Sequence, residues 1–393
     1  MVKVKGFRFA GINCGLKKSN KKDLGLILSD EKCIAHAVFT KNKVIAAPLE
    51  VGKEILRFDE LFGVIANSGN ANACTGNKGV IATNKILNSL SKATGYQSYN
   101  FFPSSTGIIG VQLDYGKINN GISKLVKSLN QNNFKDFAES IRTTDKYIKY
   151  KHVQVRIGKH KGNILGIAKG AGMIHPGMAT MLCFLITDLK FNKNTFKKLI
   201  NNAVDSSFNC ISVDGDMSTN DTVLALSNGM ADNKMIDNKS AGLGKVTKEI
   251  QGIFDSLAED IVRDGEGSTK ICRVVVKGAR DKKSADFIAR QISTSLLFKT
   301  ALYGSDPNWG RIIASVGSTQ INYIKPNKID IHIGKIKIVK NGELYGNLSS
   351  AKKLMKKKSI EITINLNKGK SQAFMLTNDI GHDYIKLNSL YTT

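Results

Sequence analysis

The sequence is poor in acidic residues, in proline and in tryptophan. Its 393 residues include 32 Asp and Glu against 58 Lys and Arg, for a formal net charge of +26, with five prolines and one tryptophan. No apolar stretch approaches the roughly 18 to 20 residues of a membrane-spanning helix. The N-terminal residues lack the apolar core of a secretory signal. We therefore expect a cytoplasmic protein without a membrane partner.

The cysteines do not follow a metal-binding or disulfide pattern. The chain has six cysteines, scattered at positions 14, 33, 74, 183, 210 and 272, and none forms a Cys-x-x-Cys pair. This spacing gives neither a zinc site nor a disulfide framework. We interpret all six as structural thiols, with Cys183 buried in an apolar run, and expect no bound metal.

The excess of positive charge suggests a nucleic-acid-binding protein, because basic surfaces attract phosphate backbones. However, only nine of the 58 basic residues are arginine, and the lysines are spread along the whole chain. The densest run, residues 352–358, contains no aromatic residue and is typical of a solvated face. We expect no nucleic-acid partner, although a basic nucleic-acid-binding protein is an alternative that experiment must exclude.

Length and hydrophobic spacing indicate two lobes of mixed composition. With 41% hydrophobic and 23% charged residues, the chain is globular and long enough for two sizeable cores. Apolar residues at spacings of three and four predict amphipathic helices, most clearly at residues 250–261 and also at 79–93, 119–129, 134–141, 196–204 and 285–296. Strands are expected at residues 33–39, 61–66, 152–157, 163–168, 271–276, 329–333 and 360–366. We predict an α+β fold of mixed α/β layers, with sheets packed against amphipathic helices.

Three local interpretations complete this picture of the fold. Residues 103–110 resemble a common Ser/Gly turn, and Trp309 is expected in a turn as an aromatic anchor. The C-terminal segment carries Tyr, Leu and Ile, and we expect it to pack against the rest of the protein.

The chain is organised around residues 169–188. Glycines and one proline fill the first half of this stretch, and the second half is an apolar run of strand length. Thr180 lies at the junction, where a rigid strand can fix a hydroxyl nucleophile beside a loop that leaves room for substrate. A threonine that simply favours a strand is the alternative.

Other segments contain residues that could form an oxyanion hole or carry a site carboxylate, and two segments lack the pattern of a nucleotide or calcium site. Thr106 and Gly107 supply a hydroxyl and an unobstructed backbone N–H, the donor types of an oxyanion hole. Glu266 stands between two glycines before an expected strand, although an exposed turn acid is the alternative. Residues 170–175 do not complete a dinucleotide-binding motif, and residues 214–221 do not fit a calcium loop because the glycine is misplaced and no closing Glu follows.

Eight separated motifs, spanning nearly the whole chain, resemble in order the signatures of the ornithine acetyltransferases of arginine biosynthesis. They are Asn67-Ser-Gly-Asn-Ala-Asn-Ala-Cys-Thr-Gly76, Ser104-Ser-Thr-Gly-Ile-Ile-Gly110, Thr143-Thr-Asp145, Lys169-Gly-Ala-Gly-Met-Ile174, His175-Pro-Gly-Met-Ala-Thr-Met-Leu182, Asp214-Gly-Asp-Met-Ser-Thr-Asn-Asp221, Asp264-Gly-Glu-Gly267 and Asp306-Pro-Asn-Trp-Gly-Arg311. Any one of these motifs would be weak evidence, whereas eight in this order make the resemblance specific.

The resemblance implies that the precursor cuts itself between Ala179 and Thr180. It would give an α chain of residues 1–179 and a β chain of residues 180–393, assembled as an α2β2 heterotetramer. It further implies acetyl transfer from N2-acetyl-L-ornithine to L-glutamate through a Thr180 ester, with acetyl-CoA as a possible second donor and no bound cofactor. The freed α-amine, with a reference pKa near 8, can serve as the base for its own hydroxyl.

The resemblance also assigns roles to residues away from the cleavage position. Thr106 and Gly107 would form the oxyanion hole. Substrate would be held by Thr180 and by further matching positions, which are Thr143 or Thr144, Lys169, Glu266, Asn388 and Thr393. An N-terminal-nucleophile amidohydrolase or aminopeptidase, which would pass the acyl group to water, is the competing enzyme hypothesis.

Overall fold

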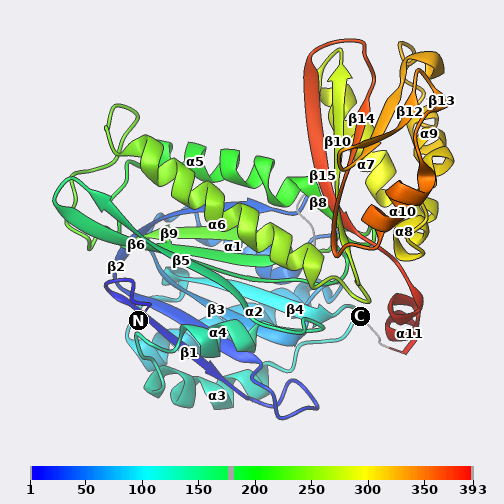
Figure 1. Cartoon of the computed structure of the whole chain (residues 1–393). Coiled ribbons are helices and arrows are strands. Elements are labelled where there is room, and N and C mark those ends of the chain that lie inside the picture. Colours follow the sequence, from blue (N-terminus) through cyan, green and yellow to red (C-terminus); the bar gives the residue numbers. More distant parts are fainter. Residues whose placement is uncertain (1, 176–180, 391–393) are drawn as a thin grey trace.

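The computed structural model describes residues 2–175 and 181–390, which form a large lobe and a small lobe (Figure 1). The strands of the large lobe are β1 (Phe7–Ile12), β2 (Leu24–Phe39), β3 (Leu61–Asn70), β4 (Phe101–Ile108), β5 (Lys149–Ile157), β6 (His160–Lys169), β7 (Leu182–Thr187) and β9 (Thr222–Ser227). Its helices are α1 (Ala47–Ile55), α2 (Gly76–Thr94), α3 (Tyr115–Lys127), α4 (Phe134–Ser140), α5 (Lys193–Ser206) and α6 (Leu243–Arg263), with the short 3₁₀ turns η1 (Ser98–Asn100) and η2 (Phe208–Cys210).

The strands of the small lobe are β8 (Ile211–Ser212), β10 (Ile271–Ala279), β11 (Asp330–Ile333), β12 (Ile336–Lys340), β13 (Glu343–Leu344), β14 (Ser359–Asn365) and β15 (Ser371–Asn378). Its helices are α7 (Lys282–Thr294), α8 (Leu296–Tyr303), α9 (Trp309–Gly317), α10 (Leu348–Met355) and α11 (His382–Leu390), with the 3₁₀ turn η3 (Pro326–Lys328).

The large sheet has the strand order β4-β3-β2-β9-β7-β6-β5, and β1 pairs with β2. Its long strand β2 joins two halves, because Leu24 to Leu28 pair with β3 and Ile34 to Phe39 pair with β9. We predicted only the second half of β2. The first half is almost entirely apolar and buried, and such a run lacks the polar alternation that marks a strand.

The apolar run after Thr180 becomes β7, near the middle of the large sheet. This strand pairs with β6 in antiparallel and with β9 in parallel orientation. All six of its residues are buried, because α5 and α6 cover one face of the sheet and α1 to α4 lie on the other (Figure 1). The first described residue of this region, Met181, is therefore attached to a rigid core strand.

The small lobe is built around β10, which pairs in parallel with β14 and in antiparallel with β15. Helices α7 and α9 pack with this sheet around a separate apolar core. At the edge of the sheet, β15 pairs with the short β8. This pairing ties the small lobe to the chain segment that leads back into the large sheet at β9.

Two expected turns are wrong. Residues 103–108 belong to β4, which pairs in parallel with β3, because the buried sheet accommodates small Ser and Thr side chains. Trp309 begins α9, whose N-cap Asn308 accepts a hydrogen bond from the backbone N–H of Arg311. The tryptophan still packs against the small-lobe core, as expected for an anchor.

The expectation that the C-terminal segment packs holds only in part, because Tyr384 and Leu387 are partly buried whereas the other apolar side chains of its helix are exposed. Helix α11 has no buried residue, and Ile385 and Leu390 are 63% and 81% exposed. Its apolar residues do not form one stripe, so the helix has no continuous face to bury. The helix lies at the side of the small lobe (Figure 1) and reaches the large lobe's cavity through polar contacts described below.

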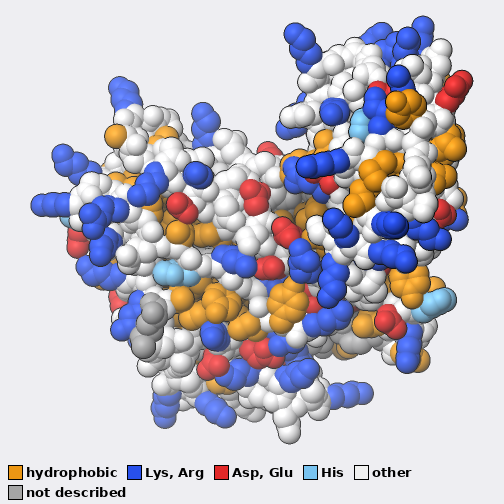
Figure 2. Space-filling model, viewed as in Figure 1, with side chains coloured by type: hydrophobic (Ala, Val, Ile, Leu, Met, Phe, Trp, Pro, Cys, Tyr) orange, Lys and Arg blue, Asp and Glu red, His pale blue; other side chains and the backbone are white. Residues whose placement is uncertain are grey.

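The surface carries dispersed basic side chains (Figure 2), and the cysteines lie in different environments, with Cys74 exposed. Figure 2 shows Lys and Arg side chains scattered over the visible face of both lobes. The lysines at positions 352, 353 and 356–358 are all exposed. The six cysteines are all free, and Cys183 is buried. No helix in the described part of the chain has the length and apolar character needed to cross a membrane.

Candidate active site

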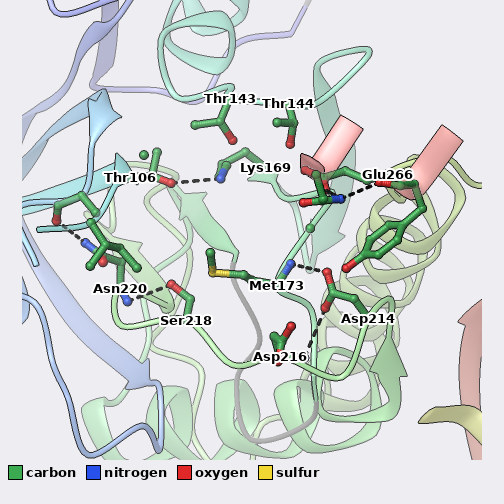
Figure 3. Close-up of a pocket in the computed structure, with 16 residues that line it drawn as sticks. Thr106, Thr143, Thr144, Lys169, Met173, Asp214, Asp216, Ser218, Asn220 and Glu266 are labelled. Carbon is green, nitrogen blue, oxygen red and sulfur yellow. Dashed lines mark hydrogen bonds between the residues drawn. The ribbon is translucent and has the colours of Figure 1, made fainter. Parts of the chain in front are cut away.

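A polar cavity of about 160 Å³ lies where strands of the large sheet end beside the small lobe (Figure 3). This is below the roughly 300–1,000 Å³ of pockets for drug-sized ligands, so its size suits an amino acid. The structure brings seven of the sequence-predicted site residues to this cavity, namely Thr106, Gly107, Thr143, Thr144, Lys169, Glu266 and Asn388. The remaining three, Ala179, Thr180 and Thr393, lie outside the described residues.

Lys169 ends β6 and donates a hydrogen bond from Nζ to Oγ1 of Thr106, near the end of β4, over 3.0 Å. The ammonium group has donors only, so the threonine oxygen must accept this bond. The hydroxyl proton of Thr106 is thereby left free to be donated elsewhere. Burial lowers the pKa of Lys169 below its ordinary value, while the nearby Asp145 carboxylate opposes that shift.

Gly107 follows Thr106 in a conformation with φ of +133°, which side chains disfavour. A Cβ atom at this position would overlap the backbone of Gly69 and Asn70 on the neighbouring strand β3. Glycine is therefore required both by the backbone angle and by the close approach of the two strands.

A buried ion cluster holds the loop that carries Thr143 and Thr144. Asp145 accepts hydrogen bonds from the backbone N–H of Thr143 at 3.0 Å and of Gly170 at 2.7 Å. Lys149 donates to Asp145 at 2.7 Å and also pairs with Asp264. Burial alone would raise the pKa of Asp145, but the ammonium groups of Lys149 and Lys169 hold it well below its ordinary value. The ionised carboxylate of Asp145 thus fixes the loop of Thr143 and Thr144 relative to Gly170.

Glu266 lies between α6 and β10 and is only 5% exposed, so the exposed-turn alternative is wrong. Its backbone N–H donates to the carbonyl of Ala171, and its carboxyl packs against Gly172, where any Cβ would meet it at 2.6 Å. Asn388 of α11 donates from Nδ2 to Oε2 of Glu266 over 3.0 Å (Figure 3). The polar contacts of α11 therefore complete this side of the cavity.

The sequence analysis missed the role of residues 214–221. Asp214, Asp216, Ser218 and Asn220 all line the cavity. Asn220 donates from Nδ2 to the carbonyls of Ala71 at 2.7 Å and Ser105 at 2.9 Å, which fixes this segment against β4. The density of Asp, Ser, Thr and Asn was visible in the sequence. Only the tertiary structure shows that the side chains of Asp214, Ser218 and Asn220 bind backbone groups.

The cavity has a distinctive charge balance. Its lining includes one ammonium group, that of Lys169, and three carboxyl groups, those of Asp214, Asp216 and Glu266. Within residues 2–175 and 181–390, no group of three or more His, Cys, Asp or Glu side chains is arranged to hold a metal ion. A polar cavity of this size and charge suits a ligand that carries both a carboxylate and an ammonium group.

Fold and cavity together define a two-lobed α/β enzyme whose site is assembled at the ends of core strands. The model of the ArgJ family matches residues 8–393. The "Arginine biosynthesis bifunctional protein ArgJ" of Thermotoga neapolitana is 41% identical, over 99% of this chain and 99% of that protein. The protein of the same name from Geobacter sulfurreducens is 39% identical, over 99% and 100% respectively.

A solved structure gives a consistent result. The crystal structure of arginine biosynthesis bifunctional protein argJ from Bacillus halodurans is 36% identical, with a TM-score of 0.52, and covers 54% of this chain and 100% of that chain. The chain described here belongs to the ArgJ family.

Proposed function

We propose that this protein transfers the acetyl group of N2-acetyl-L-ornithine to L-glutamate, through an ester on Thr180, in arginine biosynthesis. One observation carries the proposal: the cavity collects the matching family positions, and one of them, Lys169, pairs with Leu182, two residues after Thr180. Its small volume and its mixture of one ammonium and three carboxyl groups suit amino-acid substrates.

The first step is self-cleavage of the precursor. The Thr180 hydroxyl oxygen attacks the Ala179 carbonyl carbon, the Thr180 nitrogen leaves with a proton, and water hydrolyses the resulting ester. The products are a carboxylate at Ala179 and a free α-amine at Thr180.

Acetyl transfer then proceeds in two halves. The neutral α-amine of Thr180 takes the proton of its own hydroxyl, whose oxygen attacks the acetyl carbonyl of acetylornithine. The Thr106 hydroxyl and the Gly107 N–H would stabilise the oxyanion, a contribution of roughly 3 to 4 kcal/mol per donor in comparable sites. Ornithine leaves with the proton. The neutral glutamate amine then attacks the ester carbonyl carbon, the C–O bond to Thr180 breaks, and the amine proton passes to the Thr180 oxygen as N-acetylglutamate is released.

Lys169 has a part in this scheme that follows from its contact. By occupying the oxygen of Thr106, it directs the threonine proton away from itself and towards an acceptor such as the oxyanion. Thr143 or Thr144, Glu266 and Asn388 would hold the charged ends of the substrates, and the same is proposed for Thr393. Acetyl-CoA as an additional donor and α2β2 assembly belong to the same proposal.

Following the fate of the acetyl group separates this function from hydrolysis. Purified protein is incubated with acetylornithine, with and without glutamate, and ornithine, acetate and N-acetylglutamate are quantified. The proposal expects ornithine release that depends on glutamate and equals N-acetylglutamate formation. Acetate as the acetyl product, with no effect of glutamate, would establish the amidohydrolase alternative instead. Replacing acetylornithine by acetyl-CoA in the same assay tests the second donor.

A further inference from the structure

The segment between β8 and β9 contacts the chain on both sides of the proposed cleavage position. Before that position, Asp214 accepts hydrogen bonds from the backbone N–H of Met173 at 2.6 Å and of Ile174 at 2.9 Å. After it, Oδ1 of Asp221 accepts one from the backbone N–H of Met181 at 3.0 Å. Figure 3 shows the first of these contacts at the edge of the cavity.

Backbone hydrogen bonds reinforce both contacts. The N–H of Val213 donates to the carbonyl of Ile174 at 2.8 Å, and the N–H of Thr222 donates to the carbonyl of Met181 at 3.1 Å. Seven positions separate Ile174 from Met181, and seven separate Asp214 from Asp221. The described ends of these two stretches are therefore joined at matching positions, and the parallel pairing of β7 with β9 continues after the second of them.

Asp221 is buried in a way that packing alone does not explain. Its residue is 1% exposed, and Oδ2 has no hydrogen-bond partner among the described residues. Burying a carboxyl group with one oxygen unpaired costs stability. The other oxygen, Oδ1, accepts a hydrogen bond from the backbone N–H of Met181, and Met181 is covalently joined to Thr180.

We propose that Asp214 and Asp221 are positioning residues for the cut between Ala179 and Thr180. They bind the chain on both sides of that bond to the same segment, the one between β8 and β9. Asp221 acts through Met181, because the N–H that it binds belongs to the peptide group formed by the Thr180 carbonyl. Restraining that peptide group limits rotation about the Thr180 backbone. This inference rests on the proposed self-cleavage.

Binding the chain on both sides of the bond helps to orient the attacking hydroxyl group towards the carbonyl group. Attack of a hydroxyl on the preceding carbonyl needs the two groups within bonding reach, and misplacement by about 1 Å can cost roughly 100-fold in rate. A loop fixed at both ends samples fewer unproductive conformations than one fixed at a single end. In this step the Thr180 oxygen bonds to the Ala179 carbonyl carbon, the C–N bond breaks, and the hydroxyl proton passes to nitrogen. Neither aspartate gains or loses an atom.

The two aspartates are expected to respond differently to asparagine. Asp221 uses one oxygen towards Met181, and an asparagine oxygen can accept the same bond. Asp214 uses both oxygens, so an asparagine would turn an NH₂ group towards one of the two backbone donors. Asp221→Asn should therefore be cut at close to the wild-type rate. Asp221→Ala and Asp214→Asn should be cut roughly 10- to 100-fold more slowly.

The test follows the precursor by denaturing electrophoresis after pulse-labelled cell-free synthesis, with thermal unfolding of each purified variant measured in parallel. Asp188→Ala is the matched control. Asp188 is also 1% exposed and accepts backbone hydrogen bonds, from Lys5 at 3.0 Å and Asn163 at 2.6 Å, but directly after the opposite end of β7. It should lower the unfolding temperature while leaving the cutting rate unchanged.

Each outcome decides the inference. Slow cutting of Asp221→Ala, restored in Asp221→Asn and absent from Asp188→Ala, supports it. Wild-type cutting of Asp221→Ala overturns it. So does equal slowing of Asp188→Ala and Asp221→Ala at equal loss of stability, because the contacts would then serve folding only. An uncut wild-type chain is visible without any variant, and it overturns the proposed self-cleavage together with this inference.

Discussion

Lys169 and Thr106 are joined by a hydrogen bond of 3.0 Å that connects the end of β6 to the end of β4. The two residues are far apart in sequence and come from strands on opposite sides of β7 and β9 in the sheet order. Because Lys169 donates to the hydroxyl oxygen of Thr106, the Thr106 proton is donated to another acceptor. The Thr106 side chain lines the cavity, so that acceptor can be a bound ligand.

Thr106 is expected to act through its hydroxyl. Thr106→Val removes the proposed oxyanion donor while keeping the shape of the side chain, and it should lower kcat for acetyl transfer by roughly 100- to 1,000-fold. Thr106→Ser keeps the hydroxyl and should recover most of that loss. Steady-state assays of ornithine release measure both variants. Equal activity of Thr106→Val and wild type would remove Thr106 from the mechanism.

Thr180→Ala should abolish both the cut and the transfer. On denaturing electrophoresis the wild type is expected as fragments 1–179 and 180–393, whereas the variant should remain one full-length, inactive chain, because no hydroxyl is present to attack. Intact-mass spectrometry of wild type exposed to acetylornithine should locate the acetyl group on the fragment 180–393. A cut Thr180→Ala chain would contradict the proposed nucleophile.

Gly107→Ala is expected to destabilise the protein by about 1–3 kcal/mol, because its methyl group would overlap the backbone of β3. Gly110→Ala provides the control, since Gly110 also has positive φ, at +81°, but nothing lies within 4 Å of its Cβ position. Urea unfolding of both variants separates steric overlap from backbone strain. If the two lose equal stability, the close approach of β4 to β3 contributes nothing.

Glu266→Gln should weaken binding of the donor substrate. The carboxylate is proposed to face a substrate ammonium group, and a charge-assisted hydrogen bond contributes about 1.5–3 kcal/mol, so KM for acetylornithine should rise roughly tenfold or more. N2-acetyl-L-norleucine, in which a methyl group replaces the ammonium, serves as the control substrate. Its KM should change little. A parallel rise for both substrates would show that Glu266 only shapes the cavity.

Asp214 should make stability depend on pH in a defined window. Burial raises its pKa from 3.8 to about 6. Between these values the folded protein holds a proton that the unfolded chain has released, so this group's contribution to stability grows as the pH falls from about 6 towards 4. Relative to Asp214→Asn, wild type should gain up to roughly 1.4 kcal/mol per pH unit there. Denaturant unfolding at several pH values measures the difference, and a constant difference would contradict the shift.

Much of the architecture was predictable from apolar spacing. The helix expected at residues 250–261 lies inside α6, and the strand pair expected at 152–157 and 163–168 lies inside β5 and β6, because each element has one clearly marked face or turn. The failures share a cause. β4 is rich in Ser, Thr and Gly, and the first half of β2 is uniformly apolar, so neither shows the alternation by which a strand is identified.

Some residues of the candidate site could be named from the sequence, and others could not. Motif resemblance named Thr106, Gly107, Lys169, Glu266 and Asn388, but no spacing rule relates residues drawn from β4, β6, the α6–β10 loop and α11. Asp145 and Asn220 lie in two of the motifs but were given no role, because they bind backbone groups distant in sequence. Local pattern does not encode such contacts.

By itself, then, the sequence determined the mixed α/β class and most helices, because these depend on local periodicity, and its motifs named the candidate site residues. Only the tertiary structure decided that seven of those groups share one cavity, that Glu266 is buried, that α11 is exposed, and that Asp214 and Asp221 hold the chain on both sides of residues 175–180. The reason is physical: strand order and lobe packing bring together residues hundreds of positions apart, and those non-local contacts fix burial, charge environment and hydrogen-bond partners.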